Sequence, residues 1–458
     1  MEFTKIKNQD LQVSYKITVP SSQINENIKL KFQELGNSIR LNGFRKGKIP
    51  DHILKNKYGD AVRQEVVQQS FEKALKNITK SENLELLSSP NITQIKSQEG
   101  LDLEFEMDLV LKPSFSFPKF SELKIPNPVF KISIEDIRRE ILLSLAKIED
   151  GVYEDSEIAS SKGDLIIVDI KSYEGEKLSE KPFITNQKIE IGANIFLPEL
   201  EDELVNVKKD EEKTVSIQTL NLDKNGISEI KFHIKALQIL KAKKNFKIDN
   251  KVSIKLGFDK IEDLKISVQQ SLEKYCEDLK ANFLKIKLFD ELEKILTFQV
   301  PKTILNKEID QVKQKYLNFK TNQIKESDLL KNNLAYLNKL EFIKISNKSD
   351  DIREKYFEQI ALRRVRIGIF IEEFVLKNKI EVSKEEIGNM IYNQASLFPG
   401  KEKEIFKIYQ QNAQLLDSLV RPELERKAVK KILEQVNLED KNFSRESLEK
   451  SIKNLHSL

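Results

Sequence analysis

The stretch that organises the chain is Gly43-Phe44-Arg45-Lys46-Gly47-Lys48-Ile49-Pro50, which lies between two segments of helical periodicity. Its glycines permit turn conformations that other residues avoid, and the fixed φ of Pro50 suits the first position of a helix. The pattern therefore predicts a tight, exposed tip between two helices. An aromatic ring at Phe44 beside the cations Arg45 and Lys46 suits docking onto a surface and is poorly suited to catalysis. The stretch also fails as a phosphate-binding loop, because its glycines are one residue too close and an isoleucine follows the lysine.

The sequence on both sides of the tip has the periodicities of a small α+β domain. Before the tip, residues 11–19 alternate apolar and polar side chains as in a half-buried strand, and helical spacing follows from an N-cap at Ser21 or Ser22. After the tip, helical spacing pauses at Tyr58-Gly59-Asp60 and continues to Ile78. We expect these helices to cover one face of an antiparallel sheet. The other stretches with strand pattern are residues 91–96 and 101–111.

The length of 458 residues, a stretch marked by prolines and the changes of periodicity along the chain predict about three domains joined by a linker. Prolines mark the linker, and a short helix begins near Ser133 with Asp136 as a capping residue. A long helix predicted at residues 261–296 would extend roughly 50 Å. The fold class is therefore multidomain α+β, with a long-helix C-terminal domain that carries arms. We expect an α+β head at residues 1–112, a linker and connecting helix at 113–149, a small β-rich domain at 150–243 and a helical domain at 244–458.

Finer patterns predict the elements of the last two domains. The β-rich domain should contain short strands around one helix, and the helical domain should contain amphipathic helices with grooves between them. A capping box at Ser383 and Glu386 marks one helix start, and Gly400 and Pro422 should interrupt the helices that follow. The strand patterns cover residues 164–173, 187–192, 213–219 and 228–240, and the further helices start after Pro301 and cover residues 350–378.

Composition excludes several classes of protein. The 77 cations and 73 anions nearly balance, so bulk charge does not indicate a nucleic-acid coat. The single Cys276 excludes an internal disulfide and fits a reducing compartment, while the scattered histidines support neither a metal site nor acid–base catalysis. The N-terminus lacks the apolar core of a signal peptide, and no apolar run approaches membrane-spanning length. We therefore expect a cytoplasmic protein without a metal, a cofactor or a membrane partner.

Two apolar features each allow two interpretations. The apolar stripes of the C-terminal helices, including Phe283, Leu288 and Leu292, either pack helix against helix or lie open in grooves that hold apolar client segments. The β-rich domain either is a prolyl isomerase, whose dry aromatic pocket weakens amide resonance, or uses its few aromatic side chains to fill a small core. Helix packing and core filling are favoured. The aromatic residues of the β-rich domain are Tyr173, Phe183, Phe196 and Phe232.

The tip and the segment Tyr58-Gly59-Asp60-Ala61-Val62-Arg63-Gln64-Glu65-Val66 resemble the bacterial trigger factor family, and the order of the domains agrees. The resemblance implies an ATP-independent, ribosome-associated chaperone that meets nascent chains at the exit tunnel, holds them in an open state and assists folding and export. It also implies that Phe44, Arg45 and Lys46 contact protein and rRNA of the large ribosomal subunit. Whether the free protein forms a homodimer is left open by the sequence.

The same resemblance implies an FKBP-type prolyl isomerase fold for the β-rich domain. The family's Ile-Pro-Gly-Phe-Glu segment appears here as Leu197-Pro198-Glu199-Leu200-Glu201, and Ile170 and Leu178 stand where the family has aromatic residues. We therefore expect isomerase activity to be weak or lost. The alternative is that the chain is primarily a prolyl isomerase whose helical arms recruit substrate. A third interpretation, a secreted chaperone, conflicts with the missing signal peptide. The pocket candidates are Ile170, Leu178, Leu197, Leu200 and Phe232.

Overall fold

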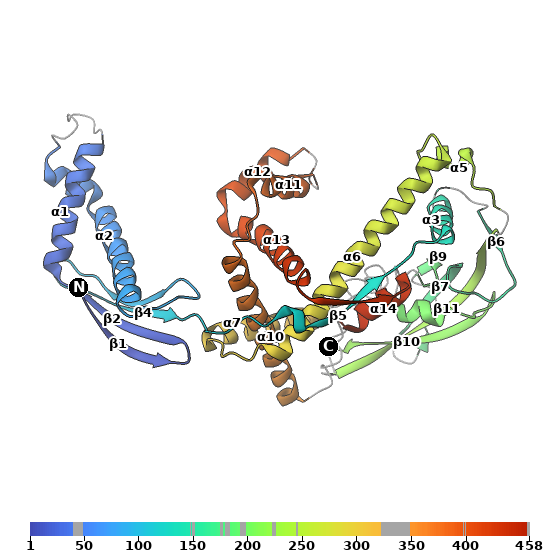
Figure 1. The fold of residues 1–458 in the computed structure, drawn as a ribbon, viewed down its shortest axis with the longest axis horizontal. Coiled ribbons are helices and arrows are strands. Elements are labelled where there is room, and N and C mark those ends of the chain that lie inside the picture. Colours follow the sequence, from blue (N-terminus) through green and yellow to red (C-terminus); the bar gives the residue numbers. More distant parts are fainter. Residues whose placement is uncertain are drawn as a thin grey trace. The chain divides into compact units, whose positions relative to one another are not determined.

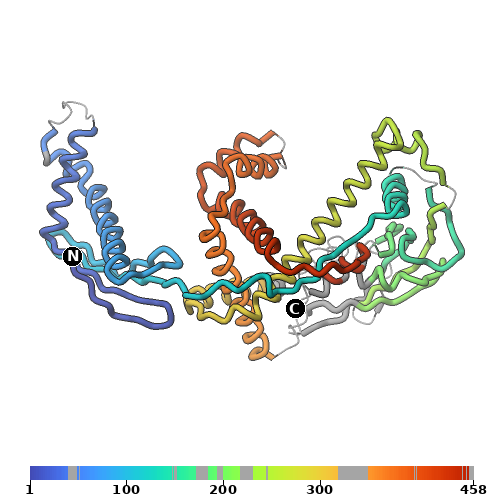
Figure 2. Tube along the Cα trace, in the orientation of Figure 1, coloured from blue at the N-terminus to red at the C-terminus, as the bar shows by residue number. Residues whose placement is uncertain are grey.

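The computed structural model divides the chain into two compact units (Figures 1 and 2). The first unit contains Met1–Phe117 and Thr297–Glu308, and the second contains Pro118–Leu296 and Ile309–Leu458. Both helices and sheets are present, which confirms the predicted multidomain α+β class. The residues that the structure describes are 1–39, 49–146, 148, 152–174, 177–178, 184–192, 198–221, 226–243, 246–321, 349–396, 398 and 400–455.

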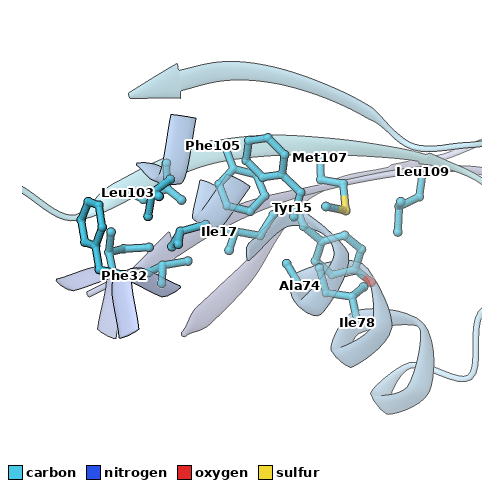
Figure 3. Close-up of a cluster of buried hydrophobic side chains, with 14 of the residues drawn as sticks. Tyr15, Ile17, Phe32, Ala74, Ile78, Leu103, Phe105, Met107 and Leu109 are labelled. Carbon is cyan, nitrogen blue, oxygen red and sulfur yellow. The ribbon is translucent and has the colours of Figure 1, made fainter. Parts of the chain in front are cut away.

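The first unit is built on an antiparallel sheet in the order β1-β2-β4-β3, with helices α1 and α2 packed on one face. On that face Ile17 pairs with Phe105 and Tyr15 pairs with Met107, and all four side chains are buried (Figure 3). The strand predicted at residues 101–111 is confirmed over Leu103–Val110, where every second side chain is buried, but the prediction is wrong at Leu101, which precedes the strand and is 60% exposed. The elements are β1 (Glu2–Gln9), β2 (Gln12–Val19), α1 (Ser21–Ser38), α2 (Asp51–Ser81), β3 (Asn91–Lys96) and β4 (Leu103–Val110).

Several local predictions in this unit are wrong. Helix α1 begins directly after Pro20 without a side-chain cap, and Pro50 precedes α2 in an extended conformation instead of occupying its first position. Helix α2 does not pause at Gly59, because a glycine costs only about 1 kcal/mol within a helix and the buried Leu54 and Val62 anchor it on both sides. Strand β1 is an addition to the predicted elements. Nearly all of its side chains are exposed, so the strand has no alternation of buried and exposed positions that could identify it in the sequence.

The β-rich domain in the second unit forms a sheet in the order β10-β11-β7-β8, with β6 paired to β11 and β9 paired to β7. The predicted strands correspond to β7, β9, β10 and β11. The buried faces of β7 and β11 supply a hydrophobic core to which the short helix α4 contributes. The elements are β6 (Tyr153–Asp155), β7 (Leu165–Glu174), β8 (Lys177–Leu178), β9 (Ile184–Glu190), α4 (Pro198–Glu203), β10 (Glu212–Asn221) and β11 (Gly226–Ala242).

The rest of the second unit is mostly helical, and α6 is the longest helix that the structure describes (Figure 1). The helices predicted at residues 261–296 and 350–378 are confirmed as α6 and α10. None of the described helices is long and apolar enough to cross a membrane. The helices are α3 (Ile134–Ala146), α5 (Asn250–Lys255), α6 (Ile261–Ile295), α7 (Lys302–Thr321, whose first turns belong to the first unit), α10 (Asp350–Lys377), α11 (Lys384–Ala395), α12 (Glu402–Gln411), α13 (Ala413–Leu433) and α14 (Arg445–Leu455).

The linker and the C-terminal segment pair in a way that the sequence did not predict. Strand β5 (Lys124–Val129) forms a parallel pair with β12 (Asn437–Asn442). The carbonyls of Leu123 and Val129 accept hydrogen bonds from the chain that contains β12, so the odd-numbered residues face that strand. The prolines of β5 occupy even-numbered positions, where the missing N–H points to the free edge. A linker that contains several prolines can therefore still pair with another strand along one of its edges.

Proline 422 does not interrupt the helix that contains it. Pro422 lies inside α13, contrary to the predicted break, whereas Gly400 does lie between α11 and α12 with φ near +84°. The buried residues of α13 all follow the proline and anchor the C-terminal part of the helix. Packing of that part offsets the hydrogen bond that proline removes. These buried residues are Ala428, Val429 and Ile432.

The two predicted capping boxes, at Ser133 and at Ser383, are both present. The Ser383 hydroxyl accepts a hydrogen bond from the Glu386 backbone N–H at 3.2 Å, and the Glu386 carboxylate accepts one from the Ser383 N–H at 2.7 Å. The Asp136 carboxylate similarly accepts from the N–H and the hydroxyl of Ser133. Lys427 of α13 also donates to the Glu386 carboxylate at 2.7 Å. The start of α11 is thus bonded to a neighbouring helix as well as capped.

This bonded carboxylate predicts a pH dependence of stability. Hydrogen bonds from Lys427 and from the Ser383 backbone lower the pKa of Glu386 from 4.5 to about 2. Because the folded-state pKa is depressed, the stabilisation is complete above the ordinary pKa and is lost as the pH falls from 4.5 towards 2. We expect Glu386→Gln to flatten the dependence of the thermal midpoint on pH in that range, as followed by circular dichroism. Equal slopes for the variant and the wild type would contradict this assignment.

Candidate functional sites

The predicted surface-docking tip is framed by two helices that pack closely. Residues 40–48, which include Gly43, Phe44, Arg45, Lys46 and Gly47, lie outside the described residues. Helix α1 ends before this segment and α2 begins shortly after it. The prediction that helices flank the tip is confirmed, while the roles of the tip residues stay predictions.

The two flanking helices approach each other at a glycine. A Cβ added at Gly36 would lie 3.3 Å from the Leu54 side chain, which is tighter than ordinary contact. Lys31 of α1 forms an ion pair with Glu65 of α2 at 2.8 Å. Ile49 belongs to the stretch predicted to be an exposed tip, but it is buried in the head core, so the prediction of exposure is wrong at this residue. Together these contacts bring both ends of the tip segment onto one rigid helix pair.

Three of the five predicted pocket residues meet inside the β-rich domain. Ile170 on β7 pairs with Ile234 on β11, and Phe232 lies two residues earlier on β11, so its side chain points to the same face. Leu200 projects from α4 into the same hydrophobic cluster. Ile170, Phe232 and Leu200 each have 0% exposed surface. The side chains of Leu178 and Leu197 lie outside the described residues.

Helix α4 is positioned over this core by buried polar contacts. The Ser160 hydroxyl donates to the carbonyl of Leu204 at 2.6 Å and accepts from the N–H of Val207 at 2.9 Å. The buried carboxylate of Glu201 accepts a hydrogen bond from the N–H of Gly192 at 3.1 Å. These bonds satisfy groups whose burial would otherwise cost free energy. The helix is therefore held rigidly, with Leu200 in the core.

The hydrophobic cluster of the β-rich domain also includes side chains from two long helices. Val312 and Tyr316 of α7 and Phe357 of α10 are buried members of it. The rings of Tyr316 and Phe357 lie 5.3 Å apart, and Lys313 pairs with Glu354 at 2.5 Å. Sequence periodicity indicated that these helices are amphipathic but not which domain they would contact.

The helical domain exposes apolar side chains on consecutive helices that contact one another. Tyr392 on α11 is 65% exposed, Phe398 between α11 and α12 is 51% exposed, and Ile408 on α12 is 47% exposed. We call these three residues the arm surface. Helix α12 has an apolar face, yet none of its described side chains is buried. The residues of this surface were not predicted, although the amphipathic pattern of α12 was a signal for it.

The groove candidates named from the sequence have a different role. Phe283, Leu288 and Leu292 are all buried along α6. The helix-packing interpretation is therefore confirmed for them, and the open-groove interpretation is wrong. Burial also raises the pKa of the Cys276 thiol on the same helix, which disfavours the reactive thiolate. Among the described residues, no group of His, Cys, Asp and Glu side chains is arranged to hold a metal ion.

Comparison with known proteins places the chain in a family. The family profile of the bacterial trigger factor protein matches residues 1–142, and the profile of the trigger factor C-terminus matches residues 260–434. The chain belongs to the trigger factor family. The segment between the two matches holds most of the β-rich domain, and relatives align across it. The head lies within the first match, and most of the helical domain lies within the second.

The relatives align with nearly the whole chain. The trigger factor of Rickettsia massiliae (strain Mtu5) is 26% identical over 454 residues, covering 98% of this chain and 97% of the relative. That of Rickettsia prowazekii (strain Madrid E) is 27% identical, covering 97% and 96%. That of Azorhizobium caulinodans is also 27% identical, covering 98% of each.

A similar protein is also found among solved structures. It is described as "Promiscuous Substrate Recognition in Folding and Assembly Activities of the Trigger Factor Chaperone", with 17% identity and a TM-score of 0.42. The match covers 95% of this chain and 99% of that one. The family assignment rests on the sequence matches.

Proposed function

We propose that this trigger factor is a cytoplasmic, ATP-independent chaperone that docks on the large ribosomal subunit and holds nascent chains in an open state, assisting folding and export. The observation that carries the holding role is the arm surface, where three large apolar side chains remain exposed. Helices α11 and α12 pack together, and exposed apolar side chains on neighbouring segments are typical of interaction sites for apolar partners. Several weak apolar contacts give reversible, promiscuous binding, which suits a holder of unfolded segments.

The proposed docking site is the tip. Arg45 and Lys46 would meet rRNA phosphate or acidic protein surface, and Phe44 would fill an apolar notch. The rigid helix pair of α1 and α2 supports this proposal, because it fixes both ends of the tip segment and so lowers the entropy cost of docking.

The arm surface predicts a selective loss of chaperone activity. Replacing Tyr392, Phe398 and Ile408 by serine should weaken the binding of an unfolded client about tenfold, which corresponds to the loss of roughly 1.4 kcal/mol. The readout is suppression of light scattering by a denatured client as chaperone is titrated in, together with client affinity from fluorescence anisotropy.

A matched control removes equally exposed apolar side chains elsewhere in the same unit. Ile134, Ile158 and Ile266 are 84%, 69% and 53% exposed. Their joint replacement by serine should leave client binding unchanged. Equal losses in the two triple variants would show that general surface hydrophobicity, and not the arm surface, holds clients.

We also propose that the β-rich domain keeps an FKBP-like fold with weak or no isomerase activity. Four of the five pocket positions are aliphatic, and the one aromatic, Phe232, has no exposed surface with which to grip a prolyl ring. The domain would then serve mainly as a further contact surface for clients. The alternative, a chain that is primarily an isomerase, would need an aromatic pocket open to solvent.

A protease-coupled assay on a proline-containing tetrapeptide tests this proposal. We expect the full chain to change the rate of prolyl isomerisation by less than a few fold over the uncatalysed reaction. Turnover well above that rate would favour the isomerase alternative. Because Leu200 is fully buried, its replacement by alanine must be checked by circular dichroism before any loss of rate is assigned to the pocket.

A further inference from the structure

A cavity of about 760 Å³ lies in the second unit where six elements meet. Its walls come from the connecting helix α3, the strands β7 and β9, the helix α4, the long helix α6 and the C-terminal helix α14. The volume falls within the range of sites that bind small molecules or single side chains. None of the residues discussed for client holding or docking lines it. The cavity therefore needs its own explanation.

The cavity combines apolar walls with an excess of carboxylates. Leu143, Leu165, Ile189 and Leu272 supply apolar surface from three different elements and from β7. The charged lining consists of four carboxylates and two cations. The carboxylates are Glu140, Glu190, Glu201 and Glu449, and the cations are Lys188 and Arg445.

Three of the four carboxylates already have partners. Glu449 accepts a hydrogen bond from the Tyr275 hydroxyl at 2.9 Å and lies 3.6 Å from the Arg445 guanidinium. The same guanidinium lies 4.0 Å from Glu140. Glu201 accepts from a backbone N–H, as described above. Arg445 therefore forms ion pairs with two carboxylates, although its buried Nε has no hydrogen-bond partner among the described residues, and the cavity keeps an excess of negative charge.

Glu190 differs from the other three. Among the described residues, none donates a hydrogen bond to its carboxylate or forms an ion pair with it, although it is half-buried at the end of β9. Burial raises the pKa of Glu190, and the neighbouring Glu140 and Glu201 raise it further, against the opposing charges of Arg139 and Arg445. A cation that enters the cavity would therefore stabilise the ionised carboxylate of Glu190 more than the carboxylates of the other three glutamates, which already have partners.

We propose that this cavity binds an alkylammonium group, a protonated amine on an aliphatic stem, with Glu190 as its counter-ion. The ammonium would donate charge-assisted hydrogen bonds to Glu190, while the methylene groups pack along Leu143 and Leu272. The Tyr275 ring at the cavity wall offers an additional face for the cation. Two sources present this chemistry, a free polyamine and a lysine side chain of a polypeptide.

Calorimetric titration of the full chain with 1,5-diaminopentane and with spermidine tests the proposal. We expect saturable binding at one site, no binding of 1-pentanol, and affinity at least about tenfold weaker for Glu190→Gln. The matched control is Glu203→Gln on α4, an exposed carboxylate outside the cavity, which should bind as the wild type does. Circular dichroism of both variants checks that they fold, and Glu140→Gln provides a second variant of the lining with an intermediate loss expected.

Titration with two further ligands distinguishes a free polyamine from a lysine side chain. These ligands are a short unstructured peptide with one lysine and the same peptide with that lysine acetylated. Binding of the diamine alone identifies a free amine as the ligand, and binding of the lysine peptide but not of its acetylated form identifies a side chain. Both results support the alkylammonium site. Equal affinity of wild type and Glu190→Gln for the diamine, or no saturable binding of any amine, would overturn it.

Discussion

Replacement of Phe105 by alanine is expected to lower the free energy of unfolding of the head by about 3–5 kcal/mol. Phe105 is buried at the centre of β4 and pairs with Ile17 across the sheet (Figure 3). It also contacts Phe71 edge-to-face, with ring centroids 4.6 Å apart. The substitution removes a large apolar side chain and an aromatic pair together, and leaves a cavity between the sheet and α2. Hydrogen exchange over residues 1–112 should show faster opening of the head, by a factor on the order of a hundred or more.

The matched control is Leu101→Ala in the same unit. Leu101 is 60% exposed and lies two residues before β4, so its truncation should change stability by less than about 0.5 kcal/mol. Exchange of the helical domain should be the same in both variants. Equal protection losses in the two variants would contradict the assignment of Phe105 to the core.

Sequence patterns predicted the local elements well where burial is periodic. The alternation at residues 101–111 identified β4 because every second side chain faces the core. The capping box at Ser383 and Glu386 identified the start of α11, since its bonds join residues three apart. The long apolar stripe of α6 also identified that helix. In each case the deciding interaction is short in sequence and needs no knowledge of the rest of the fold.

The missed features depend on residues that are far apart in sequence. Strand β5 forms its ladder with β12, more than three hundred residues later, and its prolines concealed it. The cavity near Glu190 draws its lining from elements spread between α3 and α14. The stripe of α6 was visible, but periodicity could not show that Leu288 faces a core whereas Ile408 faces solvent. Which apolar face is covered is decided by tertiary packing.

Loss of the tip side chains is expected to have the largest effect on function. Replacing Phe44, Arg45 and Lys46 by alanine removes one apolar anchor and two cations from the proposed contact with the large subunit. Anchors of this kind are each worth about 2 kcal/mol or more, so binding should weaken on the order of a hundredfold. If the cations meet rRNA phosphate, the variant should also have a salt dependence shallower by about two in the log–log slope.

The control for charge is Lys73→Ala combined with Lys76→Ala, which removes two exposed cations from α2 at a distance from the tip in sequence. This variant should bind ribosomes as the wild type does. Weakening equal to that of the tip variant would mean that general positive charge, and not the tip, supports binding.

Co-sedimentation of the full chain with ribosomes, at two salt concentrations, is the most direct measurement of docking through the tip. The wild type and the lysine control should pellet with the ribosomes, and the Phe44, Arg45 and Lys46 triple alanine variant should remain in the supernatant at both salt concentrations. Undiminished pelleting of the triple variant would contradict docking through the tip.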